Sequence, residues 1–163
     1  MNRIEKLREF VDELLLNKKD VEDRRCGYIH LYGVAFACAL IAKKRGANIE
    51  LAVMAGMLHD LYAYKMKEIM QVEEIEDHAR DGAIYAREVL NKLNLTTADE
   101  TNVICTAIHN HSNKGGKFSE LDEILIDADV IQHCFYNPLF PIAPREEERL
   151  KNLLTEFGMN HTE

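Results

Sequence analysis

Apolar residues recur at helical spacing along most of this chain. In the first segment they lie three and four residues apart, as on the buried face of an amphipathic helix: Ile4, Leu7, Val11, Leu14 and Leu15. The alternation of apolar and polar residues that indicates strands is nearly absent. We therefore predict an all-α fold, a helical bundle packed around one core.

Several residues mark where further helices should begin and end. Gly46 is suited to end a helix that begins near Val21. Asn48 is suited to begin the next helix, which contains the run AGMLHDLYAY. Residues 97–100 (TADE) form a capping box that opens a helix. Ser119 is expected to cap the helix that contains ELDEILIDADVIQHCF.

Two more helices are expected in less regular surroundings. The acidic segment QVEEIEDHARDGAIYAREVLNKL should start as a loop and become a helix near Ala79. The run NPLFPIAP holds all three prolines and should break the helical structure. A last amphipathic helix is predicted over about 145–157, and its first residues, REEER at 145–149, are expected to be a solvated helix start.

Composition limits the classes of function. A formal net charge of −8, with 20 Lys and Arg, argues against binding of a nucleic-acid duplex or a membrane surface through a basic face. We find no uninterrupted apolar run of about 18 residues and no apolar signal core near the N-terminus, so we expect no membrane span and a cytoplasmic protein. The four cysteines form no CxxC pair, and we expect free thiols: Cys26, Cys38, Cys105 and Cys134.

Polar residues interrupt the apolar pattern of three predicted helices. His30 lies in one of them, His59 and Asp60 in the next, and Asp127 and Asp129 in the run LIDADVIQ. A buried carboxylate is costly unless a positive charge lies beside it. Two neutral imidazoles and two carboxylates suit a divalent cation such as Mn, Fe, Co, Ni or Zn. Water on such an ion becomes more acidic and forms a nucleophile near neutral pH.

The ordered set of these residues resembles the HD-domain superfamily of metal-dependent phosphohydrolases, whose signature is H…HD…D on an all-α core. The matching residues are His30, His59 and Asp60, and the alignment of DAD with the family pattern places the last ligand at Asp129, with Asp127 as its rival. The resemblance covers about 21–135. It implies one or two divalent ions, Mg included, and an attack by metal-bound hydroxide in which Asp60 is central.

Some members of the superfamily bind a second ion, and this chain has residues that fit. His78 precedes Gly82 in HARDGA, as in the bacterial HD-type diadenosine tetraphosphate hydrolases, and His111 ends AIHNH, where those enzymes also have histidine. The resemblance then implies that Asp60 bridges two ions, with His78 and His111 on the second. We favour two ions.

The chain departs from the family pattern at two cationic positions. The lysine that many members carry three residues after the Asp is Ala63 here, and Lys65 is the nearest lysine to take the phosphate-facing role. The arginine that is common after the first ligand is Gly33. Lys114 and Arg80 are candidate replacements for this phosphate contact.

Two other histidines have open roles. His109 lies two residues from His111, about 200° round the helix, so we expect it at the surface or behind the ligands. His133 lies four residues after Asp129 on the same helical face, where it either orients that carboxylate or simply packs.

The resemblance implies a single domain, 1–163, with a break and a C-terminal helix over 137–158. It also implies a hydrolase for a phosphate ester or phosphoanhydride of a nucleotide or another small phosphorylated metabolite. Two alternatives stay open. Some HD-fold proteins with two irons are oxygenases, and a non-enzymatic sensor or binding module stabilised by metal would carry the same residues. The oligomeric state stays open.

Overall fold

The computed structural model describes residues 2–70, 76–139 and 141–159, and these residues confirm the predicted all-α fold. Eight helices lie in the described part of the chain: α1 Arg3–Leu16, α2 Val21–Arg45, α3 Ile49–Leu58, α4 Leu61–Met70, α5 His78–Leu93, α6 Ala98–Asn110, α7 Glu120–Tyr136 and α8 Pro144–Glu156.

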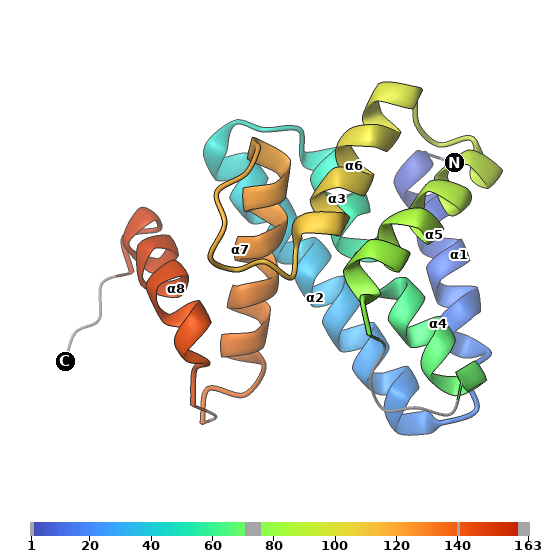
Figure 1. Ribbon diagram of the computed structural model, residues 1–163, viewed down its shortest axis with the longest axis horizontal. Helices are drawn as coiled ribbons and strands as arrows, with labels where there is room; N and C mark the ends of the chain where they lie inside the picture. The colour runs from blue at the N-terminus through green and yellow to red at the C-terminus, as the bar shows by residue number, and fades with distance from the viewer. Residues whose placement is uncertain (1, 71–75, 140, 160–163) are drawn as a thin grey trace.

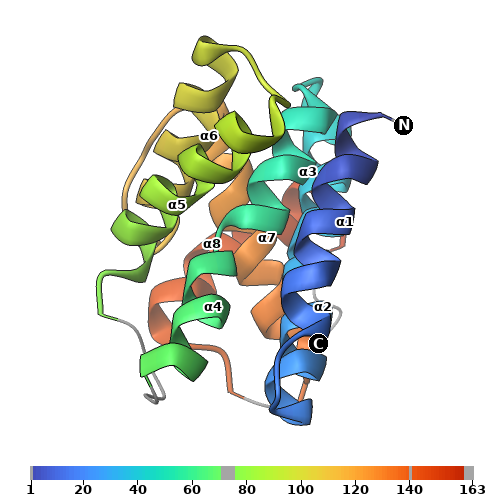
Figure 2. The same cartoon turned by 90° about the vertical axis from the view of Figure 1, so that its right-hand side faces the viewer.

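The long helix α2 organises the bundle (Figure 1). It packs against α3 on one side and α7 on another, while α5 and α6 form a neighbouring pair. Figure 2 shows α1, α2 and α3 beside one another, and α6 packs against α3 and α7. Helix α8 lies at the edge of the molecule and packs on α7 through a small apolar cluster of Val130, Leu150 and Leu154. The main core includes Leu31, Met54, Ile104 and Leu125, all fully buried.

Most helix ends follow the signals read from the sequence. Gly46 adopts φ +71° after α2, in the left-handed region that favours glycine. The Asn48 side chain accepts hydrogen bonds from two backbone N–H groups of α3. The predicted capping box is present at Thr97 and Glu100. Ser119 precedes α7 as expected, but its hydroxyl donates to Asp122 rather than capping the backbone.

The helix predicted from Asn48 onward is in fact two helices, because the helical structure is interrupted at His59 and Asp60. His59 Nδ1 donates to the Gly56 carbonyl oxygen at 2.8 Å. In a continuous helix that carbonyl would accept the N–H of residue 60. The polar pair therefore lies at a helix junction rather than inside a helix.

The C-terminal helix also differs from its prediction. It begins at Pro144, because the first position of a helix needs no backbone donor and tolerates proline. Residues 145–149 are not a fully solvated start, since Glu146 is buried and Arg149 is 14% exposed. Helix α5 begins one residue earlier than expected, and residues 71–75 of the acidic segment lie outside the described residues.

Helix α2 is long and apolar enough, by length and composition, to cross a membrane. This is weak evidence, because the core helix of a soluble protein passes the same test, and 44% of the apolar window is buried inside the structure. The expectation that the chain has no membrane span stays a prediction.

Gly56 of α3 lies in close backbone contact with α2. A Cβ atom there would lie 2.6 Å from Ala35 Cα of α2, and backbone cannot rotate out of the way as a side chain can. We expect Gly56→Ala to lower the free energy of unfolding by about 3 kcal/mol, measured by urea denaturation. Gly115→Ala is the control, because its Cβ would meet nothing within 4 Å. Equal stability of the two variants would contradict this close packing.

Candidate metal centre

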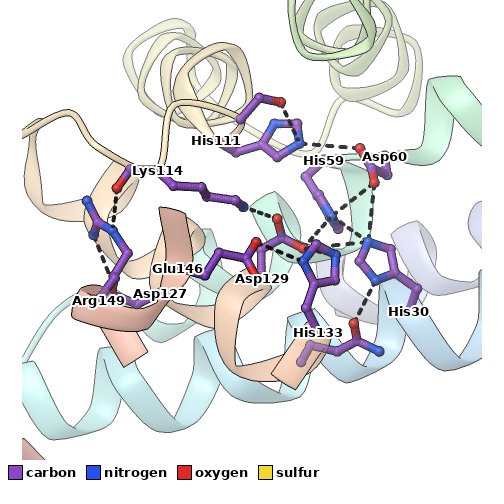
Figure 3. A network of polar contacts seen from close by, with 12 residues as sticks. His30, His59, Asp60, His111, Lys114, Asp127, Asp129, His133, Glu146 and Arg149 are labelled. Atoms are coloured by element: carbon purple, nitrogen blue, oxygen red, sulfur yellow. Dashed lines mark hydrogen bonds and ion pairs between the residues drawn. The ribbon is translucent and has the colours of Figure 1, made fainter. Parts of the chain in front are cut away.

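The four residues of the first predicted ligand set converge in the interior (Figure 3). His30 comes from α2, His59 and Asp60 from the α3–α4 junction, and Asp129 from α7. His30 Nε2 lies 3.0 Å from His59 Nε2 and 3.2 Å from Asp60 Oδ2. Asp129 Oδ1 lies 3.7 Å from His30 Nε2 and 3.8 Å from His59 Nε2. The helices therefore bring together residues that are far apart in the sequence.

Two of the imidazoles are oriented by the same local device. His59 and His111 each follow directly after a helix, α3 and α6. His59 Nδ1 donates to the carbonyl oxygen of Gly56, and His111 Nδ1 donates to that of Ile108 at 2.6 Å. Each proton is therefore on Nδ1 and each Nε2 is turned toward the carboxylates, which is the arrangement of a metal-binding histidine.

A side chain from α7 orients the third imidazole. His30 Nδ1 donates to Gln132 Oε1 at 2.9 Å. When His30 is neutral, its Nε2 lone pair then faces both the His59 Nε2 lone pair and the Asp60 carboxylate. Such a group of acceptors repels itself unless a proton or a metal ion lies between its members.

The second oxygen of Asp60 faces the second predicted ligand set. Asp60 Oδ1 lies 3.3 Å from His111 Nε2 and 3.7 Å from His78 Nε2. His111 is buried, whereas the side chain of His78 is 37% exposed and its Nε2 contacts Ser112 Oγ at 3.1 Å. The two oxygens of Asp60 thus point to two groups of nitrogen atoms, as a bridging carboxylate would.

Two buried oxygen atoms lack the partners that a metal ion would supply. Within the described residues, Asp60 Oδ1 and Asp129 Oδ1 make no hydrogen bond, although both are inaccessible to solvent. Buried polar atoms without partners are rare in folded proteins. Donor atoms of His30, His59 and Asp60 lie within 4.8 Å of one another, as do those of Asp60, His78 and His111. The donor set therefore fits one or two divalent ions of the N/O-binding class.

The electrostatics of the site attract positive charge. Burial lowers the pKa of His59 to about 4, against the effect of Asp60, so this imidazole is neutral at pH 7. Burial also lowers the pKa of His30, but the hydrogen bond and charge of Asp60 and the charge of Asp129 raise it above its usual value overall. Burial raises the pKa of Asp60, but the neighbouring imidazoles of His59, His111 and His30 lower it well below its usual range. Both carboxylates stay ionised.

The structure distinguishes Asp129 from Asp127. Asp127 turns away from the imidazoles and forms ion pairs with Arg45, at 2.6 Å, and with Arg149, at 2.8 Å. Asp129 is 3% exposed and its Oδ2 accepts from the buried ammonium of Lys114. Burial raises the pKa of Asp129, but Lys114 and the imidazoles lower it overall. The ammonium of Lys114 is therefore paired with the predicted ligand Asp129 and does not line the pocket beside it.

Arg149 of α8 holds the loop that carries Lys114. Its Nε donates to the Lys114 carbonyl oxygen and its Nη2 to the Gly116 carbonyl oxygen, both at 3.0 Å. Its Nη1 also contacts Glu123 and Asp127 of α7. The C-terminal helix is thus connected to the carboxylate of Asp129 through this loop (Figure 3).

Comparisons with known proteins identify the family to which the chain belongs. The family model described as HD domain matches residues 27–133. The chain belongs to the HD-domain family. Membership supports metal-dependent hydrolase chemistry in general, and the matched region contains all six predicted metal ligands.

One solved structure agrees with the fold. It is described as a predicted HD superfamily hydrolase from an uncultured Thermotogales bacterium, with a TM-score of 0.63 and 22% sequence identity. The alignment covers 96% of this chain and 90% of the other. At that identity the likeness concerns the fold alone. A comparison with curated proteins finds no match.

A cavity of about 340 Å³ opens beside the predicted ligands of this HD domain. That volume is within the range of small-molecule sites. Its walls come from α2, the α3–α4 junction, α4 and α7: Cys26, Ile29, His30, Asp60, Ala63, Tyr64, Lys67, Gln132, His133 and Tyr136. The pocket therefore joins two of the predicted ligands to aromatic side chains and one lysine.

That lysine is Lys67, which the sequence analysis did not single out. Lys65 points elsewhere: its ammonium lies 4.2 Å from the centroid of the Tyr85 ring, and its side chain lines a different hollow, between α1 and α4. Its position does not support the catalytic role predicted for Lys65. The sequence carries no local signal that separates the two lysines, because they lie two residues apart on α4 and the packing of that helix decides which one enters the pocket.

The other residues considered for the site lie away from this pocket. Arg80 is exposed and pairs with Asp77 and Asp81. His109 is exposed, as expected, and lines a surface hollow with Arg80. Neither contributes a phosphate contact to the pocket of this HD domain.

The buried pair of Lys114 and Asp129 yields a stability prediction. Lys114→Met removes the charge but keeps most of the side-chain length, so Asp129 is left buried without its cation. We expect the free energy of unfolding without metal to fall by about 3 kcal/mol, measured by denaturant titration. Added Mn²⁺ should restore part of the loss. Lys117→Met is the control, because Lys117 is exposed on the same loop, and an equal effect of both variants would contradict the assignment.

Proposed function

We propose that this HD domain is a divalent-metal-dependent phosphohydrolase that acts on a phosphate ester or phosphoanhydride of a nucleotide or another small phosphorylated metabolite. One observation carries the proposal. Two buried carboxylate oxygens without hydrogen-bond partners face imidazole nitrogens whose protons are held on the opposite side of each ring. This group of acceptors lies at the wall of a pocket of small-ligand size.

The residues divide into two overlapping ligand sets. His30, His59, Asp60 and Asp129 would hold one ion, and Asp60, His78 and His111 would hold the second, so we favour two ions. Divalent ions bound there would lower the pKa of coordinated water and draw charge from the phosphoryl oxygens. The bound ion would be Mn, Fe, Co, Ni, Zn or Mg, and metal analysis of the purified protein identifies it.

The chain itself supplies the binding and orientation of the substrate. Lys67 is the pocket residue with a permanent positive charge, so we assign its ammonium to a phosphate oxygen. The rings of Tyr64 and Tyr136 provide an apolar wall for the remainder of the substrate. The pocket size and the net charge of −8 favour a small molecule over a nucleic-acid duplex or a membrane. A cytoplasmic location remains part of this proposal.

The first test combines activity with metal content. The wild-type protein loaded with Mn²⁺ or Fe²⁺ should release product from p-nitrophenyl phosphate or bis-p-nitrophenyl phosphate without oxygen. Metal analysis should give one or two equivalents. Asp60→Ala should lower turnover at least about a hundredfold and metal content at least about tenfold, because both ions would lose a shared ligand. His109→Ala, which changes an exposed histidine, should alter neither.

The outcomes separate the alternatives. Turnover that requires oxygen and an iron-loaded protein would favour the oxygenase. Metal binding with no turnover of any phosphorylated compound would favour a binding module. Wild-type metal content in Asp60→Ala would refute the site.

A second prediction compares two neighbouring lysines of α4. Lys67→Ala should lower kcat/KM about tenfold or more, because the pocket loses its phosphate-facing charge. Lys65→Ala should stay within about twofold of the wild type, because its ammonium lies over the Tyr85 ring. Steady-state kinetics with a phosphomonoester would show the difference, and a larger loss in Lys65→Ala would reverse the assignment.

A further inference from the structure

A fourth imidazole is held in the same way as those of His30, His59 and His111. His133 Nδ1 donates to Glu146 Oε1 at 3.3 Å, as the Nδ1 atoms of His30, His59 and His111 each donate to an oxygen. The opposite nitrogen, His133 Nε2, faces Asp129 Oδ1 at 3.2 Å. His133 thus presents an Nε2 atom to a carboxylate of the centre from the pocket side (Figure 3).

No hydrogen bond accounts for this short approach. Asp129 Oδ1 has no hydrogen-bond partner among the described residues, so His133 Nε2 does not donate to it. With its proton directed to Glu146, His133 turns a lone pair toward a carboxylate oxygen. Two acceptors at this separation are stabilised by a cation that contacts both.

The neighbourhood of His133 matches that of the predicted ligands. Donor atoms of His30, Asp129 and His133 lie within 4.8 Å of one another. The rings of His30 and His133 are nearly parallel, with centroids 5.4 Å apart and an interplanar angle of 11°. Both residues also line the same pocket. The Nε2 atom of His78, by comparison, is in hydrogen-bond contact with the Ser112 hydroxyl.

Glu146 is a buried carboxylate next to His133. It is 4% exposed, and its carboxylate contacts His133. A buried carboxylate is costly unless it is bound, so the pair fixes the orientation of the imidazole. Glu146 comes from α8, beyond residues 27–133 that the family model matches.

We propose that His133 is an additional nitrogen ligand of the ion held by His30 and Asp129, and that Glu146 is the positioning residue that directs its Nε2 inward. The inference rests on the ion site of the proposed function. A third imidazole on that ion favours Fe, Co, Ni or Zn over Mg, which prefers oxygen ligands.

The test measures binding of Co²⁺ alone, by visible absorption and by calorimetry, so it does not depend on turnover. His133→Ala should weaken Co²⁺ binding at the first site at least tenfold and change the absorption spectrum. Glu146→Ala should weaken it about tenfold, while Glu146→Gln, which keeps an acceptor oxygen for Nδ1, should retain most of the affinity. His109→Ala and Glu147→Ala, both at exposed positions, should bind as the wild type does.

Each result has one meaning. Unchanged affinity and spectrum in His133→Ala would overturn the inference and leave the ion site intact. Wild-type protein that binds no divalent ion would instead overturn the proposed function. If circular dichroism shows that His133→Ala is unfolded, the Glu146 variants decide: equal affinity of Glu146→Ala and wild type overturns the inference.

Discussion

The neutralisation of Asp60 and Asp129 is the constraint on which the rest of this structure depends. Each carboxylate has one buried oxygen without a hydrogen-bond partner, directed toward imidazole nitrogens. Desolvating a carboxylate costs several kcal/mol unless positive charge compensates it. Lys114 supplies that charge on one side of Asp129, and the convergent imidazoles define where a divalent ion would supply it on the other. The helix ends at His59 and His111 place imidazole nitrogens next to these carboxylates.

Local backbone chemistry explains how the imidazoles acquire their orientation. At the ends of α3 and α6, where carbonyl groups lack helical partners, a histidine ring donates to the carbonyl three residues before it. The interaction gives the carbonyl oxygen a side-chain donor and fixes the tautomer of the imidazole. The break at His59 and Asp60 is therefore part of the site: it lets two consecutive residues both face the centre.

The C-terminal helix belongs to the same arrangement, although it lies outside the region that defines the family. Glu146 contacts His133 on the pocket side of α7, and Arg149 holds the loop of Lys114 on the other side. Both paths lead to Asp129. Glu146 is therefore buried, and Arg149 only 14% exposed, for an electrostatic reason, because each is paired with a group that supports the candidate centre.

The sequence by itself determined the all-α class, most helix ends and the six residues proposed as metal ligands. These features have local signals, namely helical periodicity, capping residues and the ordered histidines and aspartates. Tertiary structure decided what depends on the direction of a side chain across helices. It separated Asp129 from Asp127, placed Lys67 rather than Lys65 in the pocket, and brought Gln132 and Glu146 to two imidazoles. Only tertiary packing determines which of two charged residues on adjacent helical turns faces the site, because the same residue types are suited both to solvent exposure and to buried ion pairs.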